Sequence, residues 1–420
     1  MSGSLWPRMN GTPKNLTLHF AGLKMKRFFL PLLIFLFLVT FIDAGYGQPP
    51  LKVGAFVPFM GRWGDSGREC AKGLLDAGKW INQRGGIFGR KLEILLIEDN
   101  SQTAETMAAY RKLNEADHIL LLYLYSTETA LALQPHIHFN RIPTLVSFLP
   151  SELANPSKSP FVFTLTPTIL DTAKIAIHFV SDRSGIKGRK PKMVFVGSLT
   201  PLDRLFLDEA KNYAKGLGID IGPEVSIPES LPYGESASGG KSTESLSSVL
   251  STMTSYDPDF AYLSLTSRES FRVLQEAKRM GLKTRWIGNR KAFDETLSPF
   301  DGAFGVQPVA PYGEDVPGMM GIKEAHQKWH PLDSHTLSYV EGWATSQVIA
   351  EVLGRSLPEE RFSREKVRGS LESFKDFILG GLLPPITITA TDHRPSVESR
   401  IFTIRDGKIS RYTSFITLAR

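Results

Sequence analysis

From Lys52 onward, short apolar runs alternate with longer amphipathic stretches. Residues 51–59 (LKVGAFVPF) are typical of a strand, and residues 66–84 repeat apolar side chains at helical spacing before a Gly-Gly stop. The alternation continues through the buried run 118–125 (HILLLYLY). Strands that alternate with helices indicate βαβ units and a parallel sheet.

A second series of the same kind begins near Pro167. Strands are predicted at 192–197 and 260–264, each followed by a helix. The fold class is therefore α/β, with two Rossmann-like, doubly wound lobes. Later pieces are expected to rejoin these lobes: a strand at 304–309, helices at 321–329, 338–353 and 364–373, and antiparallel strands at 386–390, 401–404 and 409–414, the last two joined by an Asp406-Gly407 turn.

Length and composition agree with a globular protein of two or three domains, since the chain has 420 residues, 42% hydrophobic and 22% charged. The single cysteine, Cys70, cannot form an intrachain disulfide. The net charge is +6, but residues 1–47 carry five basic residues and one acidic residue, which leaves about +2 on the remainder. No dense basic run follows, so a nucleic-acid partner is not predicted.

The N-terminal segment is interpreted as an export signal. The apolar run 28–42 (FFLPLLIFLFLVTFI) follows Lys26 and Arg27, and small residues then precede a predicted cleavage after Gly47. We assign residues 25–47 to the signal peptide and residues 1–24 to an over-extended start; an uncleaved anchor is the alternative. No cysteine lies near the cleavage site, so a lipoprotein is not expected.

Three motifs suggest catalysis or metal binding but lack the partners that this chemistry needs. Gly64-Asp65-Ser66-Gly67 resembles the surroundings of a protease nucleophile, yet it opens a helix, where Ser66 is expected to be the N-cap. Gly239-Gly240-Lys241-Ser242 has Glu235 where a P-loop needs glycine. His136 and His138 do not share a helix face. We expect no enzyme, no metal and no cofactor.

An exported pair of lobes without catalytic motifs favours a small-molecule binder. Open α/β sheets bind ligands at the carboxyl ends of their strands, and two such edges can close by a hinge. Ser126 and Thr127 follow one strand and can cap the next helix, where free N–H groups favour an anion. Ser147 ends the run PTLVSF and can hydrogen-bond the same group.

The opening block resembles a specific family. Pro58 and Gly61, then Ile81-Asn82, Gly85-Gly86, Gly89-Arg90 and Leu92-Glu93, match the start of type I periplasmic substrate-binding proteins of ABC transporters, in the leucine/isoleucine/valine-binding branch. Residues 277–284 (AKRMGLKT) resemble a second motif of that branch. The resemblance implies three crossings between lobes, placed near Pro167, Val306 and Gly381. Lobe 1 is then 52–167 plus 306–380, and lobe 2 is 168–305 plus 381–420.

The resemblance also suggests which positions bind a ligand. Ser126, Thr127 and Ser147 match positions that hold an amino acid's carboxylate, and Leu149 stands where a threonine often helps. In the second lobe, Leu202 and Thr266 replace aromatic residues. Arg290 falls where the family has the acid that pairs with an ammonium group.

Arg290 is the informative change, because an arginine repels an ammonium and can hold a carboxylate with two hydrogen bonds. An organic anion without a free ammonium, such as an aromatic, keto or dicarboxylic acid, is therefore predicted. Trp63, Phe148 and Tyr339 are expected to form the apolar walls. The alternative is that Arg290 points to solvent or pairs with Asp294.

The predicted function is capture of a small amino-acid-like or carboxylate solute by lobe closure and its delivery to an ABC permease of the inner membrane. The protein is expected in the periplasm, as a monomer. One alternative is a ligand-sensing module for a signalling receptor. A weaker alternative is a secreted α/β hydrolase, for which the sequence lacks a G-x-S-x-G elbow.

Overall fold

The computed structural model describes residues 48–99, 103–183, 185–197, 201–227, 246–357, 362–395 and 397–418, without the side chains of 103 and 201–205. The predicted signal peptide and the Gly/Ser-rich loop 230–243 lie outside these ranges. Within them, none of the helices combines the length and the hydropathy of a membrane span.

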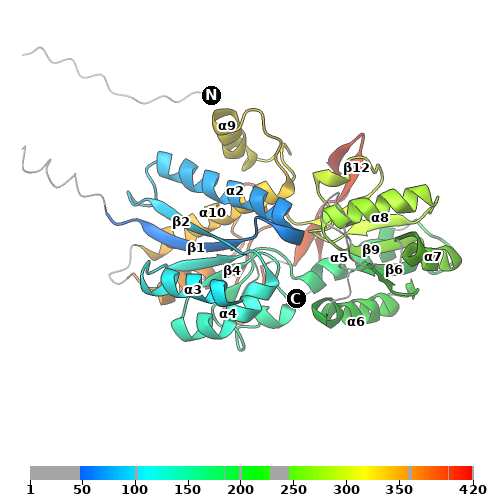
Figure 1. Ribbon diagram of the computed structural model, residues 1–420, viewed down its shortest axis with the longest axis horizontal. Helices are drawn as coiled ribbons and strands as arrows, with labels where there is room; N and C mark the ends of the chain where they lie inside the picture. Colours follow the sequence, from blue (N-terminus) through cyan, green and yellow to red (C-terminus); the bar gives the residue numbers. More distant parts are fainter. Residues whose placement is uncertain are drawn as a thin grey trace, which may run out of the picture. The chain divides into compact units, whose positions relative to one another are not determined.

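The first sheet has five parallel strands in the order β2-β1-β3-β4-β5. Its helices cover both faces, with α2 and α10 on one and α3 and α4 on the other (Figure 1). The elements are β1 (Leu51–Val57), α2 (Gly64–Gln83), β2 (Leu92–Glu98), α3 (Thr103–Glu115), β3 (Leu121–Leu124), α4 (Thr127–Asn140), β4 (Thr144–Val146) and β5 (Val162–Phe163). This arrangement confirms the predicted α/β class for the first half.

The second sheet runs β13-β12-β11-β10-β9-β6-β7, with β14 on β12 and β8 on β6. Apolar side chains of α5 and α6 pack on one face, and those of α7 and α8 on the other. The elements are α5 (Ile169–Arg183), β6 (Lys192–Gly197), α6 (Pro201–Gly216), β7 (Asp220–Ile221), β8 (Val225–Ser226), α7 (Leu246–Tyr256), β9 (Phe260–Ser264), α8 (Ser267–Arg279), β10 (Arg285–Gly288), β11 (Phe304–Gln307), β12 (Glu398–Arg405), β13 (Lys408–Arg411) and β14 (Ile416–Thr417).

Three further helices separate β11 from β12: α9 (Met319–Trp329), α10 (Leu337–Ser356) and α11 (Arg364–Glu372). The longest, α10, packs against α2 of the first sheet, so the chain leaves the second sheet after β11 and returns to it at β12. It first passes from β5 to α5 through residues 164–168. The lobe boundaries at Pro167, Val306 and Gly381 stay a prediction.

The strands predicted near the C-terminus are formed only in part. Asp406 and Gly407 join β12 to β13 as a two-residue hairpin, and both have positive φ angles of 51° and 70°, which the turn requires. The strand predicted at 386–390 is not formed. Ile386 makes an isolated bridge to Phe377, and Thr389 makes another to Asp392 within its own turn. The first bridge cannot extend toward the N-terminus, because prolines 384 and 385 lack the N–H groups that a ladder needs.

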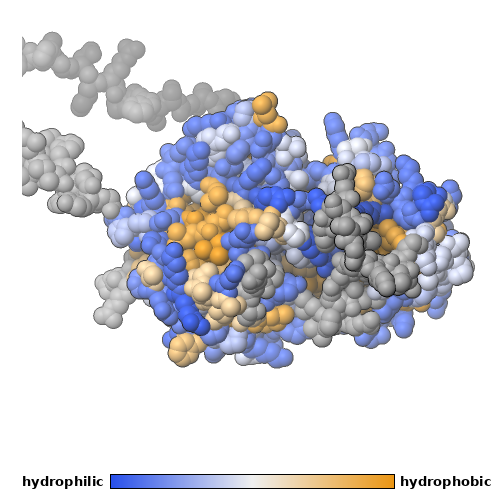
Figure 2. Space-filling model, in the orientation of Figure 1, coloured by the Kyte–Doolittle hydropathy of each residue, from blue (hydrophilic) through white to orange (hydrophobic). Residues whose placement is uncertain are grey.

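The face drawn in Figure 2 is mostly hydrophilic, with an apolar area where β1 and β2 lie. β2 is the edge strand of the first sheet, and five of its seven residues are half-buried. Isolated apolar exposure on an edge strand of this kind does not by itself identify a function.

Candidate functional site

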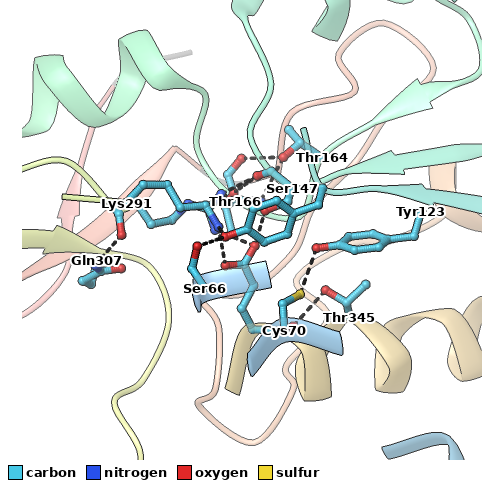
Figure 3. Close-up of polar contacts among 12 residues, drawn as sticks. Ser66, Cys70, Tyr123, Ser147, Thr164, Thr166, Lys291, Gln307 and Thr345 are labelled. Carbon is cyan, nitrogen blue, oxygen red and sulfur yellow. Dashed lines mark hydrogen bonds and ion pairs between the residues drawn. The ribbon is translucent and has the colours of Figure 1, made fainter. Parts of the chain in front are cut away.

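The candidate site lies where strand ends of the two sheets meet. Ser147 directly follows β4 of the first sheet, and Arg290 and Lys291 follow β10 of the second. Helix α10, which packs over the first sheet, contributes Glu341. Figure 3 shows Ser147, Lys291 and Ser66 around one group of polar contacts. The carboxyl ends of parallel strands are the usual ligand-binding edge of such sheets.

Arg290 contacts the first sheet through Ser147. Its Nη2 donates to the backbone oxygen of Ser147 and lies 3.2 Å from the Ser147 hydroxyl. Its guanidinium carbon lies 5.5 Å from the centre of the Phe148 ring. The structure thus brings together three of the predicted site residues, one from the second sheet and two from the first. Their roles in binding a ligand stay a prediction.

Glu341 is the partner of Arg290, in place of solvent or Asp294. Its Oε1 lies 2.7 Å from Nη1 of Arg290, and its Oε2 lies 3.2 Å from Nζ of Lys291. The Ser147 hydroxyl donates to Oε1 as well. All three charged side chains are at least nine-tenths buried, with exposures of 2% for Arg290, 4% for Lys291 and 8% for Glu341.

Glu341 was not among the predicted site residues, although it lies in the helix predicted at 338–353. One signal was available: Glu341 is a lone carboxylate between Tyr339 and Trp343 in a helix whose other residues nearby are apolar or small. A buried carboxylate normally has a partner, so it could have been paired with a cation in advance.

Two glycines fix the position of Glu341 relative to α2. A Cβ atom on Gly342 would lie 2.0 Å from the backbone oxygen of Cys70, and one on Gly73 would lie 2.0 Å from the backbone oxygen of Tyr339. The two helix backbones are therefore in direct contact, because only glycine leaves room for so close an approach. Glu341, next to Gly342, is held at a fixed distance from Ser147.

A chain of hydroxyl groups extends from Lys291 toward the start of α2. The Lys291 Nζ donates to the Tyr125 hydroxyl at 2.8 Å, and that hydroxyl donates to Ser66 Oγ, also at 2.8 Å. Ser66 Oγ in turn donates to the backbone oxygen of Trp63 at 3.2 Å. The prediction that Ser66 caps the helix is wrong, because α2 already begins at Gly64 and its N-cap residue is Trp63.

The charges of this cluster shift one another's pKa values. Burial raises the pKa of Glu341, but Arg290 and Lys291 outweigh it and lower that pKa to about 2. Burial lowers the pKa of Lys291 to about 8, although Glu341 opposes the shift. Burial also acts to lower the pKa of Arg290, and the charge of Glu341 reverses this and raises it. At pH 7 the cluster therefore carries two positive charges and one negative charge.

Two nitrogens of Arg290, Nε and Nη1, are buried without a hydrogen-bond partner among the described residues. Nη1 lies 2.7 Å from Glu341 Oε1 as an ion pair, whereas Nε has no such contact in the part of the chain that the structure describes. A small cavity adjoins the guanidinium, lined also by Lys291, Gln307, Ser338 and Glu341. Its volume for water-sized spheres, about 10 Å³, is close to the minimum for one water molecule. A buried donor of this kind indicates a place for a water molecule or another acceptor.

The hydroxyl groups of Ser126 and Thr127, both predicted to bind the ligand, form hydrogen bonds within the lobe of the first sheet. Ser126 caps α4, accepting from the backbone N–H of Thr129 at 3.2 Å, and it donates to Asp99 Oδ2 at 2.8 Å. Thr127 donates to the backbone oxygen of Phe148. Ser126 therefore confirms the predicted cap, and Thr127 supports the loop that carries Phe148.

Two predicted positions are not at the cluster. Leu149 is buried among the apolar side chains between the first sheet and its α4 face. Tyr339 does not form a wall next to Arg290, because its side chain leaves α10 on the other side. The Tyr339 ring stacks on His335 with centroids 3.7 Å apart, and its hydroxyl donates to Asp76 Oδ2 at 2.9 Å.

Two other predicted positions, Thr266 and Trp63, lie beside an ion pair that joins elements of the two sheets. Thr266 caps α8 in a capping box with Glu269, and Glu269 Oε1 pairs with Arg62 Nε at 3.0 Å. Trp63, the neighbour of Arg62, is partly buried. Leu202 begins α6, but its side chain lies outside the described residues. A second ion pair of the junction, Asp65 to Arg268, measures 2.6 Å.

In the part of the chain that the structure describes, histidine, cysteine and acidic side chains form no group of three or more that could hold a metal ion. Cys70 lies within the core, where its Sγ is 3.3 Å from the Tyr123 hydroxyl, as Figure 3 shows. Burial raises the pKa of Cys70 to about 12, so this thiol stays protonated at neutral pH.

Comparisons with known proteins agree with this architecture. A family model described as periplasmic binding protein matches residues 50–408. No curated protein matches the chain significantly. A branched-chain amino acid ABC transporter protein from Thermus thermophilus with bound valine is similar, with a TM-score of 0.77 and 20% identity over 89% of this chain and 97% of that one.

Two other solved structures have similar folds. A fatty acid ABC transporter substrate-binding protein from Thermomonospora curvata has a TM-score of 0.76 and 19% identity, over 89% of this chain and 94% of that one. A solute-binding protein of R. palustris in complex with benzoate has a TM-score of 0.70 and 16% identity, over 86% and 95%. The family model confirms the predicted family and its general solute-binding function. The solved structures confirm the predicted fold class.

Proposed function

Because the chain belongs to the periplasmic binding protein family, we propose that it captures a small organic acid outside the cytoplasm and delivers it to an ABC importer. In this proposal the solute carries a carboxylate and no free ammonium group. The protein binds its solute without making or breaking covalent bonds. It acts as a monomer after a signal peptide, residues 25–47, is removed.

One observation carries the choice of an anion. Arg290 and Lys291 are both buried, and Glu341 is the single carboxylate in contact with them among the described residues. The cluster therefore has an excess of positive charge, and it retains an unpaired Arg290 donor. An anionic ligand compensates both, whereas an ammonium group would be repelled.

The names of similar proteins favour the same class of solute. The R. palustris protein was solved with benzoate, and the Thermomonospora curvata protein is named for fatty acids. Both ligands are carboxylic acids without an ammonium group. The Thermus thermophilus protein holds valine, which makes an aliphatic amino acid the competing candidate.

Solute entry requires the two sheets to separate, since the space beside Arg290 has the size of about one water molecule. Contacts from Arg290 and Lys291 to the first sheet then re-form around the solute. Binding at a junction of two lobes is typical of hinge closure. Small-angle scattering is expected to give a smaller radius of gyration with a saturating solute than without it.

Calorimetry with benzoate, 3-methyl-2-oxobutanoate and valine tests the proposal on protein purified after export. We expect one of the two acids without ammonium to bind, and Arg290→Ala to weaken that binding at least about tenfold, or ~1.4 kcal/mol. Arg279→Ala is the control, because Arg279 is exposed and pairs with Glu276 on the same helix. Valine binding that survives Arg290→Ala, with no binding of either acid, would overturn the proposal.

A further inference from the structure

We propose that Glu341 sets the charge of the solute, so that the site accepts a monoanion and discriminates against dianions and neutral molecules. The inference rests on the proposed function and narrows it, because a binding site for organic acids does not by itself fix how many negative charges the acid carries. It identifies Glu341 as a specificity-determining residue and monocarboxylates as the solute class.

The argument begins with the number of buried charges. Arg290 and Lys291 contribute two positive charges, and Glu341 contributes one negative charge. One further negative charge makes the cluster neutral. A second one would leave a buried excess of negative charge, which is costly without a partner.

The Glu341 carboxylate is held in the cluster by contacts with three side chains. Its Oε1 accepts a hydrogen bond from the Ser147 hydroxyl and forms an ion pair with Arg290. Its Oε2 forms an ion pair with Lys291. At Gly342 the backbone of α10 packs in direct contact with that of α2. Glu341 therefore stays in the cluster and compensates one of the two positive charges of Arg290 and Lys291.

Room for one more acceptor remains on the other edge of the guanidinium. Nε of Arg290 is buried without a partner in the described part of the chain, while Nη1 and Nη2 face Glu341 and Ser147. A monocarboxylate can accept from this edge while Glu341 keeps its own contacts. The solute and Glu341 then share the guanidinium, which offers five donors.

Asp294 also lines the cavity and has to be considered. This carboxylate is half-buried at the rim and caps a short 3-10 helix, accepting from the Thr296 N–H at 2.8 Å and from the Ser267 hydroxyl at 2.7 Å. Water screens its charge in part, and among the described residues it forms no ion pair with Arg290 or Lys291. Asp294 is therefore not counted among the buried charges, and its amide variant tests that assignment.

Variants that replace one charged side chain by a neutral polar one give a series of buried charge. Wild type carries +1, Glu341→Gln carries +2 and Lys291→Gln carries 0 in the cluster. Two probe sets cover aromatic and aliphatic solutes: phthalate, benzoate and benzamide, and glutarate, valerate and valeramide. Each set offers charges of −2, −1 and 0 on a similar skeleton. Dissociation constants are measured by calorimetry on the exported protein.

In at least one probe set, wild type is expected to bind the monoanion at least about tenfold more tightly than the other two probes. Glu341→Gln is expected to raise the affinity ratio of dianion to monoanion at least about tenfold, and Lys291→Gln to raise the ratio of neutral probe to monoanion. Asp294→Asn is the matched control and is expected to change neither ratio more than about twofold. Circular dichroism checks that each variant is folded.

The outcomes separate this inference from the proposed function. If wild type binds a monoanion but Glu341→Gln leaves the ratio unchanged, Glu341 does not set the charge, and the proposed function stands. An equal shift in Asp294→Asn would overturn the assignment of buried charges. If wild type binds no monoanion of either set but binds valine, both the proposed function and this inference fail. Should Glu341→Gln not fold, the Lys291→Gln ratio decides.

Discussion

Nη1 of Arg290 and Oε1 of Glu341 lie 2.7 Å apart and join an element of the second sheet to a helix on the first. Both side chains of the pair are buried, and Glu341 also forms an ion pair with Lys291. Removal of the carboxylate alone leaves two buried cations without compensation. Removal of a cation as well restores the balance in part. Stability and solute binding therefore depend on the same three side chains.

Glu341→Ala is expected to lower the free energy of unfolding by about 3–5 kcal/mol, as for other buried pairs that lose one partner. The measurement is urea unfolding followed by fluorescence. Glu276→Ala is the control, because Glu276 pairs with Arg279 on an exposed helix surface and is worth at most about 1 kcal/mol. Similar losses in both variants would contradict the role of burial.

Gly342→Ala is expected to destabilise the protein, since the added Cβ would meet the backbone of α2 at 2.0 Å. Overpacking of this kind costs about 1–3 kcal/mol. Gly369→Ala, on an exposed position of α11 with no atom within 4 Å of the new Cβ, is expected to gain about 0.5–1 kcal/mol. Melting temperatures should move in opposite directions, and a common direction would argue against contact between the two helices.

Acid is expected to destabilise the fold through His393. This ring is fully buried, stacks on Phe163 at 3.9 Å and contacts the Val162 carbonyl and Glu372. Burial lowers the pKa of His393 below the ordinary 6.5. The unfolded chain therefore binds a proton at a higher pH than the folded chain does, so stability falls as the pH drops below about 6.5.

The test compares wild type with His393→Gln by urea unfolding at pH 7.5 and pH 5.5. The variant should be less stable at both values but should lose less stability between them. An equal loss in the two proteins would assign the acid sensitivity to other groups.

Cys70 is expected to be unreactive toward a thiol reagent at pH 8 in the folded protein and to react fully in denaturing urea. Its pKa of about 12 and its place in the core both prevent thiolate chemistry. Absorbance at the reagent's product wavelength measures the reaction. Fast labelling under native conditions would mean that α2 separates readily from β3.

Local pattern was enough to predict most of the architecture. Strands β6 and β9 begin and end at the predicted residues, because buried parallel strands appear as short apolar runs. The Asp406-Gly407 hairpin followed from turn chemistry alone. The segment 386–390 failed because alternation suggested a strand, whereas its neighbours in space decided the pairing.

The site was harder to predict, because it depends on contacts between residues distant in sequence. Ser147 was recognised by its place at the end of a strand and Arg290 by the family resemblance, and the structure brings them together. Glu341 is 50 residues beyond Lys291 and became visible only when α10 was packed on α2. The contacts of Tyr339 with His335 and Asp76 were not predicted, since the rotation of a helix buried all round cannot be read from its hydrophobic pattern.

The contact of Gly73 with α10 has a mechanical consequence. Where two helix backbones touch without intervening side chains, neither can tilt or slide without moving the other. Helix α2 starts at the rim of the junction. Any displacement of α2 therefore also moves the Glu341 carboxylate on α10. To alter which solutes are accepted, the polar end of side chain 341 should be varied, and the backbone contact of α2 with α10 at Gly73 should be left unchanged.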